Sequence, residues 1–314
     1  MSEASISQVR SFNRLVAERV GAVGGDFLGR KRALGESRVL WEIGPDGIDV
    51  RALRARFGLD SGYLSRLLRA LERDGIVEVT PDPSDRRVRR VSLSTRGRRE
   101  WNELDSRSDA FAASVLEPLS ARQRDDLVEA MQTVERLLTA SMIDVRVVDP
   151  RDAAAQLCLG RYYAELDERF EGGFDLSRAI STEPDELMLP AGLIVVAWLH
   201  GDPVGCGVLK LHGRAPAELK RMWVSPAVRG LSLGRRLLRE LEDLARDHGA
   251  SAAHLETNRA LTEAIALYRA SGYEEVEAFN DEPHAHHWFA KPLCDGVRPH
   301  GKSPVSRAFS VAGL

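Results

Sequence analysis

A short turn ahead of a helix could bind a phosphate group in the second half of the chain. The segment Arg229–Arg236 reads Arg-Gly-Leu-Ser-Leu-Gly-Arg-Arg, and leucines at helical spacing follow it. The first backbone N–H groups of a helix lack partners within the helix, and the helix dipole makes this end positive. Arg229, Arg235 and Arg236 add positive charge. The segment therefore predicts an anion site that suits a pyrophosphate.

A second pattern, in the first half of the chain, could contact DNA. A predicted helix that is capped by Asp60 or Ser61 and ends at Gly75 carries a stripe of leucines, and its opposite face is polar. Polar side chains near the start of such a helix can reach base edges in the major groove. Those on this face are Ser61, Tyr63, Ser65, Arg66, Arg69 and Arg73. A plain solvated helix face explains the same pattern equally well.

The residues after this helix favour DNA. Arg86–Arg99 contains seven arginines and no acidic residue. They lie in and just after a predicted hairpin, with strands at 76–80 and 88–93, where they can contact flanking phosphates or the minor groove. The candidate contacts are Arg86, Arg87 and Arg89. Because the hairpin directly follows the polar helix, DNA binding is the better interpretation.

Helices are predicted through the rest of the first half. Their bounds follow from apolar spacing, capping residues and Gly or Pro stops. They are predicted at residues 9–20, 35–43, 50–57, 95–116 and 120–139. The first half is thus predicted to be all-α with a β-hairpin wing, a winged helix-turn-helix.

Strands and helices alternate in the second half. Strands are predicted at residues 143–148, 193–200, 204–211, 218–224, 252–257, 273–278 and 286–292, and helices at 153–170, 234–248 and 261–271. The pattern predicts an α/β domain at residues 144–294 with a mixed central sheet and flanking helices, after an N-terminal domain at 1–143. The tail at 295–314 is rich in Gly, Ser and Pro and is expected to be mobile.

Composition sets the broad class. The chain has 314 residues, 43% hydrophobic and 29% charged, with a net charge of −3, which fits an ordinary soluble protein of about two domains. No apolar run approaches the ~20 residues of a membrane helix, and the N-terminus lacks a signal-peptide pattern, so a cytoplasmic location is expected. The three cysteines are far apart and form no metal-ligand pair. No metal is predicted, and the histidines at 284, 286 and 287 are expected to shape a pocket wall.

Residues 59–79 and 82–97 resemble the recognition helix and wing of the MarR family of regulators. The matching wing positions are Asp85, Arg87, Val91, Leu93 and Ser94. The resemblance covers roughly residues 5–140. It implies a homodimer, held by the first and last two helices, that binds a near-palindromic DNA site. It also implies that Asp85 orients a wing arginine through a charge-assisted bond.

The second half resembles the GNAT superfamily of acyl-CoA-dependent N-acetyltransferases. One signature, Gln/Arg-x-x-Gly-x-Gly/Ala, matches at Arg229 and Gly234, and Ser232 stands where its middle glycine belongs. A second signature matches at Asn258, Ala264, Leu267, Tyr268, Gly272 and Tyr273. The resemblance covers about residues 145–293. It implies a mixed sheet splayed like a V, with acetyl-CoA as co-substrate in the cleft.

The GNAT resemblance also implies roles for single residues. Backbone groups of Met222, Trp223 and Val224 would bind the pantetheine arm and polarise the thioester carbonyl. Glu218 would be the base for the amine, and Tyr268 would protonate the leaving thiolate. A solvated carboxylate and a core aromatic ring are the plainer interpretations of these two. The cofactor-binding set also contains Arg229, Gly230, Ser232, Leu233, Gly234, Arg235, Asn258 and Tyr268.

The leading hypothesis is a DNA-binding regulator fused to an N-acetyltransferase for a small-molecule amine or amino acid. His254 and Glu256 are alternative bases. Residues of the helix at 153–170 could recognise the acceptor, namely Tyr162, Tyr163, Glu165 and Arg169. Two further hypotheses stay open: a regulator whose second domain senses acyl-CoA or an amine without turnover, as Ser232 suggests, and a protein lysine acetyltransferase.

Overall fold

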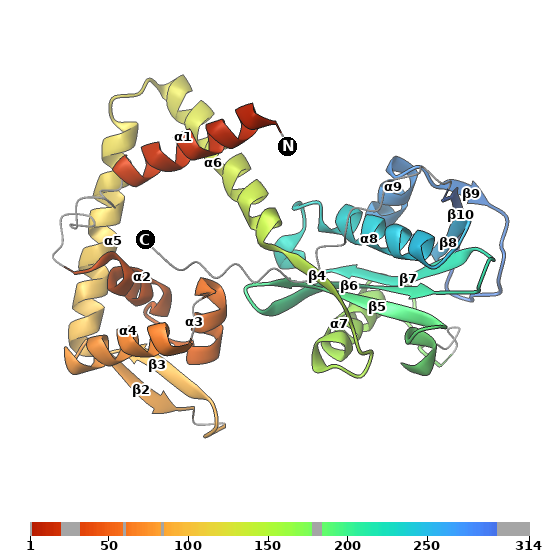
Figure 1. Ribbon diagram of the computed structural model, residues 1–314, viewed down its shortest axis with the longest axis horizontal. Helices are drawn as coiled ribbons and strands as arrows, with labels where there is room; N and C mark the ends of the chain where they lie inside the picture. Colours follow the sequence, from red (N-terminus) through yellow and green to blue (C-terminus); the bar gives the residue numbers. More distant parts are fainter. Residues whose placement is uncertain (1, 20–31, 59–60, 83–84, 178–183, 294–314) are drawn as a thin grey trace. The chain divides into compact units, whose positions relative to one another are not determined.

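The computed structural model describes residues 2–19, 32–58, 61–82, 85–177 and 184–293. They form two compact units, the first almost entirely within Met1–Ile143 and the second almost entirely from Asp144 onward. Figure 1 shows a largely helical first unit and a second unit built around a long sheet. The tail at 295–314 that the sequence predicts to be mobile lies outside the described residues.

The first unit combines helices with a three-stranded antiparallel sheet. Its strands lie in the order β1-β3-β2 and are β1 (Ile48–Asp49), β2 (Val77–Pro81) and β3 (Arg89–Leu93). Its helices are α1 (Glu3–Arg19), α2 (Leu34–Ile43), α3 (Val50–Phe57), α4 (Ser61–Arg73), α5 (Thr95–Leu116) and α6 (Ala121–Met142). The predicted helical fold with a β-hairpin wing is confirmed. The sequence did not predict β1, because two residues are too few to show a period.

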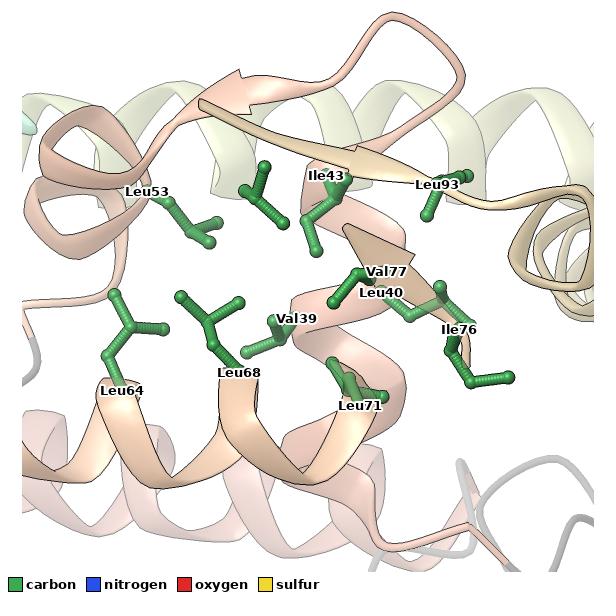
Figure 2. Packing of buried hydrophobic residues seen from close by; sticks show 11 residues of the cluster. Val39, Leu40, Ile43, Leu53, Leu64, Leu68, Leu71, Ile76, Val77 and Leu93 are labelled. Atoms are coloured by element: carbon green, nitrogen blue, oxygen red, sulfur yellow. The ribbon is translucent and has the colours of Figure 1, made fainter. Parts of the chain in front are cut away.

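Apolar side chains of α2, α3, α4 and the sheet form one core in this unit (Figure 2). Leu64, Leu68 and Leu71 of α4 point into it, at the spacing that predicted the helix. Leu40 of α2 and Leu53 of α3 are fully buried in the same core. Each such side chain contributes about 1.5–3 kcal/mol on burial. The core therefore fixes the rotation of α4 and turns its polar face outward.

Ser94 and Gly97 join the wing to the start of α5. Ser94 Oγ accepts a hydrogen bond from the backbone N–H of Gly97 at 3.0 Å and donates one to the carbonyl of Gly75 at 2.7 Å. Gly97 packs so tightly that an added Cβ would lie 2.0 Å from the carbonyl oxygen of Ile76. The end of β3, the turn after α4 and the first turn of α5 are thus held together.

The second unit is a seven-stranded mixed sheet with flanking helices. The strand order is β4-β5-β6-β7-β8-β10-β9. The strands are β4 (Asp144–Val148), β5 (Gly192–Leu199), β6 (Asp202–Lys210), β7 (Ala217–Val224), β8 (Ala252–Thr257), β9 (Glu274–Val276) and β10 (His287–Pro292). The helices are α7 (Ala153–Arg169), α8 (Leu233–Asp247) and α9 (Thr262–Ala270). This confirms the predicted α/β fold.

The sheet opens between β7 and β8. These strands run parallel and pair at two positions, Ala217 with Ala253 and Glu218 with His254. Both pairs lie at the N-terminal ends of the strands, and no later pair occurs in the described residues. β7 pairs with β6, and β8 with β10, in antiparallel register. The space beyond Glu218 is therefore left to side chains and to whatever enters between the strands.

Among the described residues, no helix is both long and apolar enough to span a membrane.

Candidate active site and DNA interface

A β-bulge interrupts β7 where it parts from β8. Lys220 lies opposite Val208 and Trp223 lies opposite Cys206, so β7 has one residue more than β6 over this stretch. Arg221 has a left-handed φ of 53°, which costs a residue with a side chain roughly 1–2 kcal/mol. A bulge leaves backbone groups out of the regular ladder and redirects a side chain. The bulge was not predicted from the sequence, because β7 has no glycine there and the glycine at the register shift, Gly207, lies in β6.

Two buried cysteines lie beside the bulge. Cys206 Sγ donates to the carbonyl of Arg221 at 3.5 Å, and Cys158 Sγ of α7 donates to the carbonyl of Gly205 at 3.7 Å. A hydrogen bond with the Cys158 thiol, together with burial, raises the pKa of Cys206. Both thiols pack against backbone next to the irregular part of β7.

The turn between β7 and α8 ends in a left-handed residue. Ser232 is the N-cap of α8 with φ 60° and ψ 19°, and its side chain makes no capping hydrogen bond. Gly230 has a φ of 84°. A glycine is favoured at position 232 because of this backbone conformation. The first N–H groups of α8 carry no cap from Ser232 and point out of the helix end, where an anion is favoured.

A cleft lies at this turn, and we call it the turn cleft. Its lining includes nearly all the residues that the GNAT resemblance assigns to acetyl-CoA, namely Met222, Trp223, Val224, Arg229, Gly230, Ser232, Leu233, Gly234, Arg235 and Tyr268. Asn258 is the exception. Its Nδ2 donates to the carbonyl of His284 at 2.7 Å and its Oδ1 accepts from the backbone of Ala260 at 2.9 Å. Asn258 therefore holds a loop in place.

Glu165 of α7 is a shared acceptor at the turn cleft. Its carboxylate accepts hydrogen bonds from Arg229 Nη2 at 2.6 and 2.7 Å, from Trp223 Nε1 at 2.9 Å and from Arg169 Nη1 at 3.3 Å. Burial opposes ionisation, but the hydrogen bonds from Arg229 and Trp223 lower the pKa of Glu165. A protein carboxylate thus holds the arginine that the sequence assigns to a phosphate ligand.

A second hollow, which we call the aromatic pocket, adjoins the turn cleft. The residues that line both are Tyr162, Leu166, Met222, Leu261, Ala264 and Tyr268. In the aromatic pocket, Phe174 stacks on Tyr163 with ring centroids 5.8 Å apart and lies 4.8 Å from the ring of His284. The sequence suggested Tyr162 and Tyr163 for this role but missed Phe174, which follows a Gly-Gly break where periodicity ends.

Three charged side chains form a chain of ion pairs between β7 and β8. Lys220 Nζ lies 3.5 Å from Glu218 Oε2 and makes a short hydrogen bond to Glu256 Oε1. Glu218 also pairs with His212 Nε2 at 3.1 Å. Glu256 lines the aromatic pocket, whereas Glu218 lies outside the lining of both hollows. Of the two carboxylates, Glu256 is therefore the one that lines the hollow adjoining the turn cleft.

Tyr268 stands at the junction of the two hollows. It is buried and lines both. Burial, with a contribution from Glu256, raises the pKa of Tyr268 above its usual range. Burial likewise raises the pKa of Tyr162, which also lines both hollows. Both phenols therefore stay protonated at neutral pH and can donate a hydrogen bond or a proton.

The remaining histidines do not converge. His254 stacks on Phe279 at 4.7 Å, and burial lowers its pKa. His284 packs in the aromatic pocket, and His287 Nδ1 contacts Glu275 Oε1 at 2.6 Å. In the described residues, no group of three or more His, Cys, Asp or Glu side chains is arranged to hold a metal ion.

The polar face of α4 is open to solvent in the first unit. Tyr63, Arg66 and Arg69 are exposed, and Ser65 is partly buried. The guanidinium of Arg66 lies over the Tyr63 ring, 5.7 Å from its centroid. The Tyr63 hydroxyl lies against α2, where a Cβ at Gly35 would come within 3.1 Å of it. The side chain of Ser61 lies outside the described part of the chain.

The arginines of the wing divide into two groups. Arg86, Arg87 and Arg89 are exposed. Arg90, by contrast, donates to the carbonyl of Asp46 at 2.6 Å and braces the loop before β1. The first group is the one the sequence named for DNA, while Arg90 belongs to the fold.

Asp85 shapes the turn of the wing. Its Oδ1 accepts a hydrogen bond from the backbone N–H of Arg87 at 2.9 Å. A bond from Asp85 to an arginine side chain, which the MarR resemblance implies, is not among the contacts of the described residues. The carboxylate thus fixes the backbone that presents Arg87.

Two helices of the first unit expose apolar faces. Neither α1 nor α6 buries any residue in the part of the chain described. The exposed side chains include Val9, Leu15, Met131, Leu137 and Leu138, each more than half exposed. A stripe of this kind on an amphipathic helix indicates a surface that packs against another chain or segment.

Comparison with known proteins accounts for both units. A model of the acetyltransferase (GNAT) family matches residues 160–273, and a model of the MarR family matches residues 28–88. An IAA acetyltransferase of Azospirillum brasilense is 38% identical over 132 residues, which cover 41% of this chain and 82% of that protein.

The chain belongs to the GNAT acetyltransferase family, and it carries a MarR-family domain ahead of the GNAT domain.

Other relatives match the GNAT domain over a shorter span. N-alpha-acetyltransferase RimI of Mycobacterium tuberculosis is 38% identical over 94 residues, 29% of this chain and 58% of that protein. The chain thus spans somewhat more than half the length of this relative. Among solved structures, a GNAT-family acetyltransferase from Staphylococcus aureus Mu50 covers 48% of this chain and 99% of its own, with 17% identity and a TM-score of 0.42.

The matched ranges contain the main elements of both sites. The GNAT match includes Glu165, the bulge at Arg221 and the turn with Ser232, and the MarR match includes α4 and the start of the wing. Of these, the sequence predicted the turn and α4 from spacing. It did not predict the bulge or the contacts of Glu165, because both depend on how β6, β7 and α7 come together.

Proposed function

We propose that this protein is a transcriptional regulator whose GNAT domain transfers an acetyl group from acetyl-CoA to the amine of a small molecule. One observation carries the enzymatic part: the turn cleft and the aromatic pocket meet at Tyr268, beside the bulge in β7. A transferase needs two substrates to reach a common point. The names of the relatives, both acetyltransferases, support the same reaction class.

The turn cleft is the proposed site of acetyl-CoA. The capless start of α8, with Arg229 and Arg235 at its edge, would take the pyrophosphate. The irregular backbone of β7 at Met222 would bind the pantetheine arm and polarise the thioester carbonyl. When acetyl-CoA binds, the guanidinium of Arg229 would leave the carboxylate of Glu165 and bind phosphate oxygens instead.

The chemical step follows from these positions. The amine nitrogen attacks the thioester carbonyl carbon from the aromatic pocket, a C–N bond forms, and the C–S bond breaks. Tyr268 gives its hydroxyl proton to the departing sulfur, and the amine loses one proton to a carboxylate. The products are an N-acetylated amine and the free thiol of CoA. Burial keeps Tyr268 protonated for this role.

The carboxylate that takes the amine proton is Glu218 or Glu256. Glu218 is the residue that the GNAT resemblance names, and Glu256 is the one that lines the aromatic pocket. Lys220 links them, so a proton accepted at one changes the charge balance of the other. We favour Glu256 as the base that acts directly, with Glu218 holding Lys220.

Release of free thiol from acetyl-CoA across a panel of amines and amino acids tests the enzymatic proposal. We expect turnover in wild type, a loss of about 10²–10⁴-fold in Glu256→Gln and a smaller loss in Glu218→Gln. Full turnover in the Tyr268→Phe, Glu218→Gln double variant would contradict the assignment of Tyr268 as the acid that protonates the leaving sulfur. If no acceptor causes thiol release, the GNAT domain would be a sensor that binds its ligand without turnover. The left-handed backbone of Ser232, at the position of the motif glycine, motivates this alternative.

DNA binding by the MarR-family domain is the second part of the proposal. The exposed face of α4 and the wing arginines would contact a near-palindromic site, and the apolar faces of α1 and α6 would join two copies. Selection of bound sequences from a random DNA pool would identify the site. A site without two-fold symmetry would contradict the dimer, and binding unchanged by Arg66→Ala would contradict the role of α4.

A further inference from the structure

We propose that the acceptor is an α-amino acid with an apolar side chain, whose carboxylate is bound by Arg221 in the aromatic pocket. The inference rests on the proposed acetyltransferase function and names the substrate class of that site. Three features of the pocket support it. Arg221 makes no ion pair in the described residues, aromatic rings line one part of the pocket, and two tyrosines lie where the pocket joins the turn cleft.

Arg221 is a cation of the aromatic pocket that makes no ion pair within the part of the chain described. It lines the aromatic pocket, is partly buried, and lies over the ring of Tyr163 at 5.7 Å. Two neighbouring basic side chains are paired: Lys220 with Glu218 and Glu256, and Arg229 with Glu165. No carboxylate forms an ion pair with Arg221 in the described residues. A guanidinium partly removed from water is best satisfied by a carboxylate, which it binds in a bidentate fork.

The backbone holds Arg221 in place at an energetic cost. Its left-handed φ of 53° lies in the bulge of β7. Strained residues of this kind persist where the surrounding structure imposes them, and they gather at ligand sites. The cation–π contact with Tyr163 holds the guanidinium over that ring.

The ring wall selects an apolar side chain. Phe174 stacks on Tyr163 and lies tilted against the ring of His284, and Phe170 meets Phe174 edge-on at 5.8 Å. Leu166 and Leu176 extend the same lining. Stacked rings favour an apolar or aromatic group over a polar one.

The amino group of the acceptor would lie where the aromatic pocket joins the turn cleft. Tyr162 and Tyr268 line both hollows, and Glu256 lines the aromatic pocket. An α-amino acid brings a carboxylate, an apolar group and an amine on one carbon, and each has a counterpart here. A polyamine does not fit, because it would bring a second ammonium group to a lining that already contains Lys220 and Arg221. A protein lysine brings no carboxylate to Arg221.

Three acceptors of matched shape test the inference: L-phenylalanine, L-phenylalaninamide and phenethylamine. The amide keeps the amine and the ring, removes the carboxylate and resembles a peptide N-terminus. With acetyl-CoA and wild-type protein, we expect kcat/KM for L-phenylalanine to exceed that for the other two by about 10-fold or more.

Variants at position 221 locate the effect. Arg221→Gln is expected to lower kcat/KM for L-phenylalanine about 10- to 100-fold and to leave L-phenylalaninamide nearly unchanged. Arg221→Lys should recover part of the loss, since it restores charge without the fork. Arg221→Gly removes the side chain but suits the left-handed backbone, so it should lose the same preference while remaining folded. Arg239→Gln, an exposed arginine of α8, is the matched control.

The outcomes separate this inference from the proposed function. Turnover without preference for the acid, or an equal loss for all three acceptors in Arg221→Gln, would overturn the inference and leave the acetyltransferase in place. If no acceptor releases thiol, the proposed function fails, and calorimetric titration of L-phenylalanine decides the inference. Binding to wild type that Arg221→Gln weakens would support it, and no binding to wild type would overturn it.

Discussion

Ser232 holds a backbone conformation that favours glycine. Its φ is 60°, and its side chain caps nothing in α8. We predict that Ser232→Gly raises the stability of the GNAT domain by about 1 kcal/mol, which shifts Tm by roughly 2–4 °C. Thermal unfolding by circular dichroism measures this. Ser225→Gly is the control, because φ at Ser225 is −52° and a glycine there only adds freedom to the unfolded chain. Equal shifts in both variants would contradict the explanation.

Tyr268 is buried where the two hollows meet. Burial raises its pKa above the ordinary value of about 10, so the neutral acid persists as pH rises. We predict no loss of kcat from this group below pH 10, and a loss of about 10²-fold or more in Tyr268→Phe at all pH values.

The pH profile of thiol release checks this. Tyr273→Phe is a matched control, since it also removes the hydroxyl of a buried tyrosine, one that lines neither hollow. A descending limb near pH 8 that disappears in Tyr268→Phe would show that the phenol titrates in the ordinary range or below it, against the direction that burial gives.

At the scale of elements, the wing presents some arginines and uses others to hold itself. Arg87 is exposed, and Arg90 donates to the carbonyl of Asp46 at 2.6 Å. We predict that Arg87→Ala weakens DNA binding, reduces its salt dependence by about one unit of slope and leaves Tm unchanged. Arg90→Ala should instead destabilise the MarR-family domain by about 1–2 kcal/mol. Fluorescence anisotropy at several salt concentrations, with thermal unfolding, separates the two. Loss of stability in Arg87→Ala would contradict the division.

The contact between the wing and α5 is a close approach of backbone. A Cβ at Gly97 would lie 2.0 Å from the carbonyl oxygen of Ile76, whereas a Cβ at Gly160 in α7 would meet nothing within 4 Å. We predict that Gly97→Ala destabilises its domain by more than about 2 kcal/mol, because backbone cannot yield as a side chain can. Gly160→Ala should stabilise its domain by about 0.5–1 kcal/mol. Denaturant unfolding of each variant tests both, and a neutral Gly97→Ala would show that α5 is free to shift.

Elements with a strong period were predictable from the sequence, and contacts between elements were not. The leucines of α4 and the stripe of α8 identify both helices, and Gly230 with Ser232 identifies the turn between β7 and α8. The bulge at Arg221 was not predicted, since it arises from the register of β6 against β7. The GNAT resemblance assigned the base to Glu218, with His254 and Glu256 as alternatives, but which carboxylate lines the pocket depends on where β7 and β8 part.

For the whole molecule, the exposed apolar faces of α1 and α6 set the expected assembly. Leu15 and Leu137 are 58% and 61% exposed, which is costly for leucines in water. We predict that Leu15→Glu with Leu137→Glu converts a dimer to a monomer, lowers DNA affinity by 10²-fold or more through loss of the second half-site, and leaves acetyl transfer intact. Sedimentation velocity and thiol release measure this. A wild-type monomer that binds DNA tightly would contradict it.

The two thiols beside the bulge allow the opening rate of the GNAT domain to be measured by alkylation. Cys158 and Cys206 have no exposed surface and bond to backbone carbonyls, so an alkylating reagent reaches them only when the packing of α7, β6 and β7 opens. The alkylation rate of each cysteine-containing peptide, measured by mass spectrometry, therefore reports how often this packing opens. A molecule bound in either hollow makes openings rarer by a factor set by its concentration over its Kd. The native ligand could thus be sought in a metabolite mixture by slowed alkylation alone, before any reaction has been detected.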